Sequence, residues 1–156
     1  MNFDELKSLM EDFDPAKLLP DLDSMLGKME LALRIAVLVG PLLLFLLGLV
    51  YLIASPKEAN YRLGYRCFFG MGSVGAWRFT QRLAGIVWGG LGLILTAVMF
   101  FYGKGFSSMD TDTMLWSAVR CILWEVGLVI ISILAINITI AFLFDRKGNR
   151  RWQKKA

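Results

Sequence analysis

Two arginines in an aromatic-rich segment are the strongest candidates for chemistry in this chain, and the chemistry they suit is anion binding. Arg62 and Arg66 lie four residues apart, with Trp77 further along the same segment. A guanidinium group can hold a phosphate or a carboxylate through two parallel hydrogen bonds. The anion is either a lipid phosphate or a polar group on a peptide or partner protein, and the residues alone leave both interpretations open.

Residue types that support covalent or metal chemistry are scarce. The chain has no histidine, which removes His-ligated zinc, His-ligated haem and any Ser–His or Cys–His catalytic pair. Cys67 and Cys121 are isolated and do not form a CxxC pair. No paired carboxylates and no phosphate-binding loop stand out. We therefore expect a protein without enzymatic activity, cofactor or bound metal.

The composition indicates an integral membrane protein, in which Arg62 and Arg66 lie between two membrane helices. Apolar residues make up 56% of the chain, against about 45–50% in an average soluble domain. Residues 35–55, 83–102 and 126–144 each lack a charged residue, and a helix needs about 20 such residues to cross a bilayer. The predicted fold is all-α, with three transmembrane helices.

We divide the chain into three parts. Residues 1–30 form an acidic amphipathic N-terminal region, residues 31–144 the three-span domain, and residues 145–156 a basic tail. Apolar residues recur at helical spacing in the first part, and Pro20 marks a second helix start within it. This amphipathic region would lie on the membrane surface or on a partner protein.

The distribution of Lys and Arg predicts the orientation. Five lie between the first two spans, two between the second and third, and six in the tail. Because cytoplasmic loops carry the excess of positive charge, we expect the N-terminus outside the cell and the C-terminus in the cytoplasm. The basic clusters adjoin apolar spans, which favours lipid rather than nucleic acid as their partner.

Three features of the spans predict helix packing. Gly85 and Gly89 form a GxxxG pattern, which lets helices approach closely, either within the chain or in a homo-oligomer. Asn137 lies within the third span and needs a hydrogen-bond partner, because hydrocarbon offers none. We interpret it as a packing residue rather than a transport site.

Two charged residues near the expected outer membrane edge suggest an ion pair. Arg34 precedes the first span, and Glu125 precedes the third. We predict that they face each other as a structural ion pair, with Arg120 as a rival partner for Glu125. The third span could begin as early as Met114 if both Arg120 and Glu125 are tolerated at its outer end.

Residues 56–82 are unusual for a loop between spans. They combine six aromatic residues, five basic residues and several glycines. The segment is too apolar for a free cytoplasmic loop and too charged to cross the membrane. We expect an interfacial loop or helix at the inner face, where glycines allow sharp turns.

A regular pattern runs through this segment and into the second span: Gly64, Tyr65, Arg66, Met71, Trp77, Arg82 and Gly85. The pattern resembles the signature of the SdpI family of bacterial integral membrane proteins, and its spacing is kept without a gap. The segment departs from that signature at three places. Cys67 stands where the family has Thr, residues 70–73 replace Ser-Met-Lys-Asn, and Gln81 stands where the family has Asn.

The resemblance implies a bacterial plasma-membrane protein. The family is named for an immunity protein that protects a bacterium against its own secreted toxic peptide and relays a signal by holding a repressor at the membrane. By resemblance, this chain is expected to confer bacteriocin resistance, or to sense a membrane-active peptide, without catalysis. The expected ligand- or partner-binding residues are Arg62, Gly64, Tyr65, Arg66, Trp77, Gln81 and Arg82.

Two other functions remain open at this point. The acidic N-terminal region and the glycine-rich helix faces suit a structural or accessory subunit of a larger bacterial membrane complex. A small transporter would have to oligomerise, because three spans offer little wall for a channel. The expected partners are membrane lipid and either a toxic peptide or another membrane protein.

Overall fold

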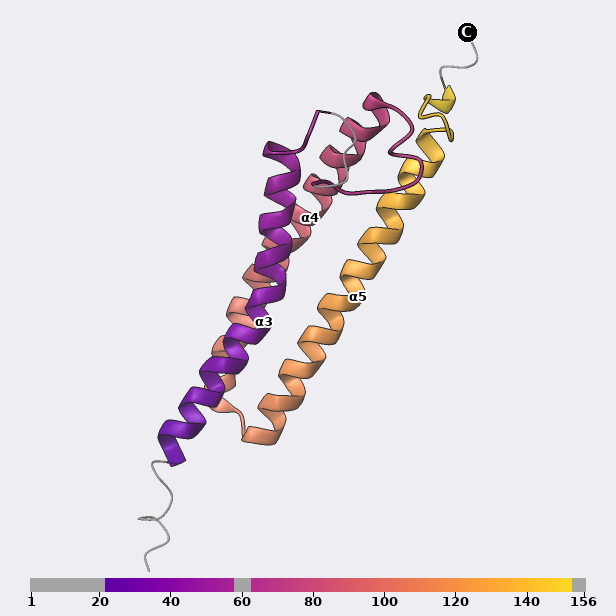
Figure 1. The fold of residues 1–156 in the computed structure, drawn as a ribbon. Helices are drawn as coiled ribbons and strands as arrows, with labels where there is room; N and C mark the ends of the chain where they lie inside the picture. The colour runs from indigo at the N-terminus through magenta and orange to yellow at the C-terminus, as the bar shows by residue number, and fades with distance from the viewer. Residues whose placement is uncertain (1–21, 58–62, 153–156) are drawn as a thin grey trace, which may run out of the picture.

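Three long helices make up most of the molecule. The computed structural model describes residues 22–57 and 63–152. The helices are α3 (Leu22–Ile53), α4 (Val74–Lys104) and α5 (Thr111–Leu143), with the short 3-10 helix η1 (Gly105–Ser108) between the last two (Figure 1). Each long helix has the length and apolar composition to cross a membrane. The prediction of an all-α chain with three such helices is confirmed, and the described residues contain no strand.

The helices are longer than the predicted spans. Ser73 caps α4 by accepting a hydrogen bond from the Ala76 N–H (3.1 Å), so residues 74–82 belong to the helix and not to the loop. Residues 22–30 continue directly into the first span as part of α3. The rest of the predicted N-terminal amphipathic region, residues 1–21, lies outside the described residues.

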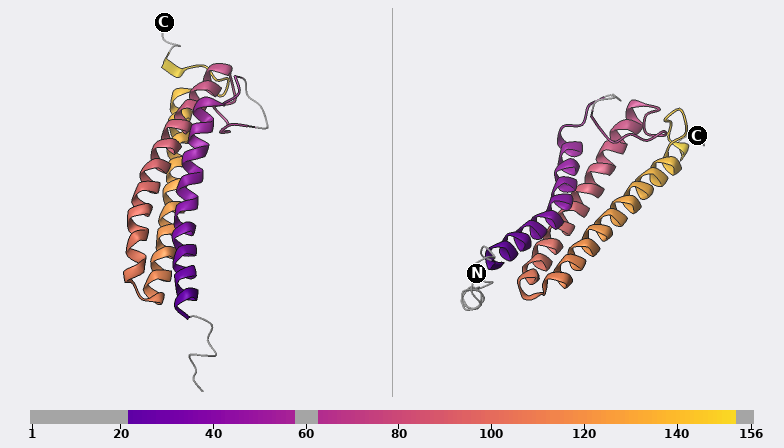
Figure 2. Two further views of the ribbon diagram at one scale, coloured as in Figure 1. Left: turned by 90° about the vertical axis from the view of Figure 1, so that its left-hand side faces the viewer. Right: turned by 60° about the horizontal axis from the view of Figure 1, so that its bottom comes forward.

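The helices run up, down and up, so the bundle has two chemically different ends (Figure 1). The N-terminal end of α3 and η1 lie at one end. Residues 54–57, 63–73 and 144–152 lie at the other, which we call the basic end. Figure 1 shows α3 crossing over α4 with α5 to one side, and the views in Figure 2 show the three helices running side by side along the bundle. Because three helices alternate in direction, the two ends of the described chain lie at opposite ends of the bundle.

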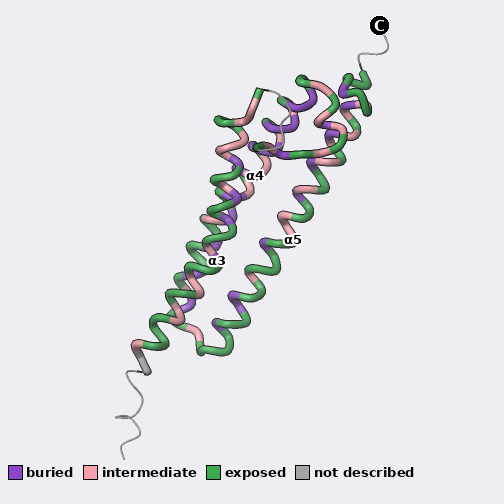
Figure 3. The backbone as a smooth tube through the Cα atoms, viewed as in Figure 1, coloured by how far each residue is buried: buried purple, intermediate pink, exposed green. Residues whose placement is uncertain are grey.

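Burial is concentrated where the helices meet and at the basic end (Figure 3). One cluster of buried apolar residues, including Tyr65, Ile136 and Phe144, lies at the basic end, and a second, including Val37 and Phe106, lies at the other. The outward faces carry large exposed apolar side chains such as Ile94 and Trp124. Such faces suit a hydrocarbon solvent, in agreement with a multi-pass membrane protein.

Glycines bring α3 and α4 into backbone contact. A Cβ added at Gly85 would lie 2.6 Å from Leu52 Cγ, and one added at Gly92 would lie 2.7 Å from Phe45 Cα. Gly89 lies against Gly48 of α3. Gly85 and Gly89, whose partner the pattern alone left open, thus face another helix of the same chain. Small residues at these positions permit the close approach.

The N-terminus of α5 offers a pH-dependent prediction. Asp110 is its N-cap, and hydrogen bonds from the side chain and backbone of Thr113 hold the pKa of the Asp110 carboxyl below its usual value. A depressed folded-state pKa means that the cap stabilises α5 above the unfolded pKa of about 3.9 and is lost as pH falls through the folded value. We expect Asp110→Ala to increase hydrogen exchange in the first turn of α5 at neutral pH.

Two comparisons check this cap. The difference between Asp110→Ala and wild type should shrink below the folded-state pKa, where the wild-type carboxyl is protonated and keeps only a neutral capping oxygen. Asp110→Asn keeps a capping oxygen without a titratable group, so its exchange, corrected for intrinsic rates, should stay independent of pH. A wild-type advantage over Asp110→Ala that did not change with pH would contradict the assignment.

Candidate functional site

A double hydrogen bond folds the segment that carries the family-like pattern. The Gln81 side chain accepts from the Tyr65 N–H (2.8 Å) and donates to the Tyr65 carbonyl (2.8 Å). Gln81 is fully buried in α4, so its amide replaces water for both backbone groups of Tyr65. We call this pair of hydrogen bonds the Gln81 clip. It holds residues 63–73 against the first turns of α4.

Trp77 and Gly64 pack beside the Gln81 clip and hold the same segment in place. The Trp77 ring is fully buried, and its Nε1–H donates to the Pro56 carbonyl (2.9 Å), just beyond the end of α3. Gly64 has φ of 120°, a conformation in which other residues are strained. A Cβ there would also lie 2.7 Å from the Trp77 ring and 2.9 Å from Gln81 Oε1. Glycine is therefore required at position 64 by both conformation and space.

Tyr65 ties the clipped segment to α5. Its hydroxyl donates to Asn137 Oδ1 (3.2 Å), and its ring meets Trp88 edge-on with centroids 5.3 Å apart. Burial raises the pKa of Tyr65, so the hydroxyl stays protonated as a donor. Asn137, which needed a partner in the span, thus joins α5 to the loop.

The positions that depart from the family signature fit close packing. Burial raises the pKa of the Cys67 thiol, which keeps it neutral. A Cβ at Gly70 would lie 2.7 Å from Cys67 Sγ, and one at Gly72 would lie 2.6 Å from the Gly148 nitrogen. The glycines at 70 and 72 leave room that Ser and Lys would fill. The segment therefore packs against a turn near the C-terminus.

That C-terminal turn was missed by sequence reasoning. Ser73 Oγ donates to the Gly148 carbonyl (2.8 Å) while it also caps α4. Asp145 Oδ1 accepts from the backbone N–H groups of Lys147 (2.9 Å) and Asn149 (2.8 Å), which shapes the turn. An Asp followed by Gly and Asn is a turn signal in the sequence. Nothing local indicates that the turn docks on Ser73.

The clip leaves basic side chains on the surface of the basic end. The exposed basic residues described there are Lys57, Arg66, Arg78, Arg82, Arg146, Lys147, Arg150 and Arg151. Phe68 and Trp152 are exposed among them, at 72% and 84%. Cationic and aromatic side chains together suit the headgroup region of a membrane with anionic lipid.

The predicted binding residues therefore separate into two groups. Tyr65, Trp77 and Gln81 are buried and bind the protein's own backbone or side chains, and Gly64 serves the same packing. Their role as ligand contacts stays a prediction. Arg66 and Arg82 are exposed and can reach a ligand. Arg62 lies outside the described residues.

The structure does not form the predicted ion pair between Arg34 and Glu125. Arg34 pairs with Glu30, one turn away on the same helix. Arg120 donates to the Ser117 hydroxyl and the Trp116 carbonyl. Because α5 begins at Thr111, Glu125 lies about 21 Å along it, near the helix midpoint rather than the membrane edge.

Comparison of the chain with protein-family models, with curated proteins and with solved structures yields no match.

Proposed function

We propose that this chain is an SdpI-type protein of the bacterial plasma membrane that confers resistance to, or senses, a membrane-active peptide without catalysis. The observation that supports the proposal most directly is the Gln81 clip. The residues that carry the resemblance form one folded unit, and Arg66 lies on its surface. The signature-like pattern thus has a physical purpose, which is to present an arginine at one face of the membrane.

The charge asymmetry of the bundle supports a cytoplasmic basic end. The exposed basic residues gather there, and Asp145 is the acidic residue described among them. The opposite end carries acidic residues, including Glu30, Asp110 and Asp112, as well as the basic residues Lys28 and Lys104. By the positive-inside rule, the basic end faces the cytoplasm and the N-terminus faces outward.

Arg66 supplies the recognition step in this proposal. A guanidinium at the headgroup level can bind a carboxylate on an inserted peptide or on a partner protein. The exposed Phe68 ring, two residues away, can insert among apolar side chains of the same ligand. Binding at this surface would sequester the peptide or register its presence, with no bond made or broken.

A survival assay tests the proposal. A sensitive bacterium expressing the wild-type protein is challenged with a panel of membrane-active peptides, beside an equally abundant Arg66→Ala variant. We expect the tolerated peptide concentration to fall by about tenfold or more in Arg66→Ala, because a hydrogen bond to a charged group contributes about 1.5–3 kcal/mol.

Two variants sharpen the assay. Arg66→Lys keeps the charge but loses the two-pronged hydrogen bonding, so it should protect only partly. Arg120→Ala removes an exposed arginine at a distance from the basic end and should protect fully. If wild type protects against no peptide in the panel, or if Arg66→Ala protects as well as wild type, the proposal fails.

The second candidate function is a structural subunit of a larger membrane complex. The outward face of α5 carries Trp116, Leu123, Trp124 and Ile131, each more than half exposed. Aromatic residues are enriched at protein interfaces. A stoichiometric partner that co-purifies in mild detergent, and is lost when Trp124 is replaced by alanine, would favour this function over peptide resistance.

A further inference from the structure

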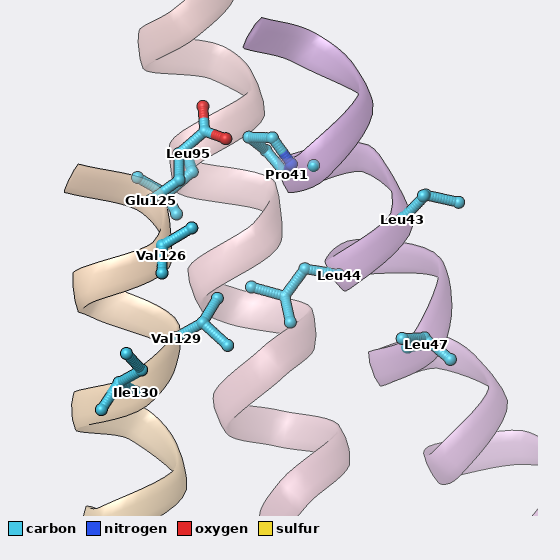
Figure 4. A pocket seen from close by; sticks show the side chains of 10 residues that line it. Pro41, Leu43, Leu44, Leu47, Leu95, Glu125, Val126, Val129 and Ile130 are labelled. Carbon is cyan, nitrogen blue, oxygen red and sulfur yellow. The ribbon is translucent and has the colours of Figure 1, made fainter. Parts of the chain in front are cut away.

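An apolar cavity lies between α3 and α5, and one carboxyl group lies at its end. The cavity has a volume of about 290 Å³. Leu44 of α3 points toward Val129 of α5 across it (Figure 4), and Leu43, Leu47, Leu95, Val126 and Ile130 complete the apolar lining. Glu125 lies beside Pro41 at the end nearer the N-terminus of α3. It is the one charged residue in the lining.

The Glu125 carboxyl has unused hydrogen-bonding capacity. The residue is 7% exposed, and among the described residues its Oε1 has no hydrogen-bond partner. The neighbouring Gly40 leaves the room it needs, since a Cβ there would lie 2.8 Å from Oε2. Pro41 has no N–H, so the Val37 carbonyl cannot receive the usual helical hydrogen bond from residue 41.

No cationic side chain in the described part of the chain lines the cavity. Arg34 pairs with Glu30 through Nη2, although its buried Nε has no hydrogen-bond partner among the described residues. Arg120 bonds to Ser117 and to the Trp116 backbone. An unpaired carboxylate near the middle of a membrane helix is costly, and such residues usually face a binding site or a partner charge. The cavity therefore lacks a positively charged hydrogen-bond donor.

The rest of the lining indicates what kind of molecule should supply that donor. Leu43, Leu47, Val126 and Ile130 line the cavity and are also between 44% and 55% exposed. The cavity thus opens toward the hydrocarbon of the bilayer. A molecule that enters by this route has an apolar body.

We propose that the cavity binds a lipophilic primary amine in its ammonium form, with the ammonium group on Glu125 and an aliphatic chain along the leucines and valines. An ammonium group offers three donors and no acceptor, which matches the unpartnered Oε1. A hydrogen-bonded charge pair also offsets the burial of the carboxylate. The site is separate from Arg66, and the proposal does not depend on the proposed function.

Direct binding tests this site. The probe is radiolabelled dodecylamine, added to the purified full-length protein in nanodiscs of zwitterionic lipid, with protein-free nanodiscs as background. We expect saturable binding to wild type that weakens by about tenfold or more in Glu125→Gln, because the amide loses the charge at nearly constant shape. Dodecanol has the same chain without the charge, and it should compete poorly.

Matched variants separate the site from general effects of charge and folding. Asp112→Asn removes an acidic group from the exposed first turn of α5, so it should bind the probe as wild type does. Val129→Phe keeps Glu125 but fills the cavity, so it should lose binding even if Glu125→Gln does not fold. Arg66→Ala should bind normally, which keeps this result independent of the survival assay. Equal binding by a folded Glu125→Gln, equal binding by Val129→Phe, or equally strong competition by dodecanol would overturn the proposal.

Discussion

Gly92→Ala is expected to lower the free energy of unfolding by about 2 kcal/mol or more, because the added methyl group meets backbone and not a movable side chain. The new Cβ would lie 2.7 Å from Phe45 Cα and 2.9 Å from Phe45 Cβ on α3. Neither helix can yield locally, so α3 and α4 must separate along the crossing. The loss can be measured by titrating micelles with sodium dodecyl sulfate and following tryptophan fluorescence.

Gly90→Ala is the matched control for this prediction. Gly90 lies two residues away on the same helix, and a Cβ there would meet nothing within 4 Å. Alanine is the better helix former by about 1 kcal/mol, so this variant should be neutral or more stable. Gly48→Ala, which places a Cβ 2.5 Å from Gly89 Cα, should behave as Gly92→Ala does. If all three variants have the same free energy of unfolding, close glycine packing is not what joins these helices.

Gln81→Glu is expected to destabilise the basic end by about 3 kcal/mol or more. The carboxylate can still accept from the Tyr65 N–H, but it loses the donor that satisfies the Tyr65 carbonyl. It also places a charge at a fully buried position. Unfolding titrations give the overall loss, and limited proteolysis between α3 and α4 reports loosening of the clip directly.

Arg82→Gln is the control for the Gln81 clip, because it alters the adjacent but exposed position. Its effect on stability should stay within about 0.5 kcal/mol. Gln81→Glu should also reduce protection in the survival assay, although Arg66 is intact, because the segment that presents Arg66 is no longer held. Unchanged proteolysis in Gln81→Glu would show that the clip does not hold residues 63–73.

Much of the architecture follows from local properties of the sequence. Long apolar stretches can satisfy their backbone in hydrocarbon only as helices, so composition was enough to predict three spans. The ends of the helices were harder to predict. Capping by Ser73 extends α4 through Trp77 and Gln81, although aromatic and basic residues made this stretch look like a loop.

Features of the site that arise from nearby residues could be predicted from the sequence, whereas contacts between distant residues could not. The importance of Gly64, Trp77 and Gln81 could be predicted from a pattern with fixed spacing, but not what they do. Gln81 bonds to a backbone 16 residues away, and Gly89 meets Gly48 on another helix. Partners so far apart in the chain leave no periodicity or motif that names them.

The charged residues show most clearly the difference between properties set by local composition and properties set by packing. The stretches that are apolar enough to cross a membrane, and the end of the bundle that is basic, follow from composition, because those properties are sums over neighbouring residues. The pairing of Arg34 within its own helix, and the place of Glu125 at the end of an apolar cavity, depend instead on how the helices pack. The physical reason is that the environment of a side chain depends on which helices pack against it, and that packing is set by close contacts between distant parts of the chain.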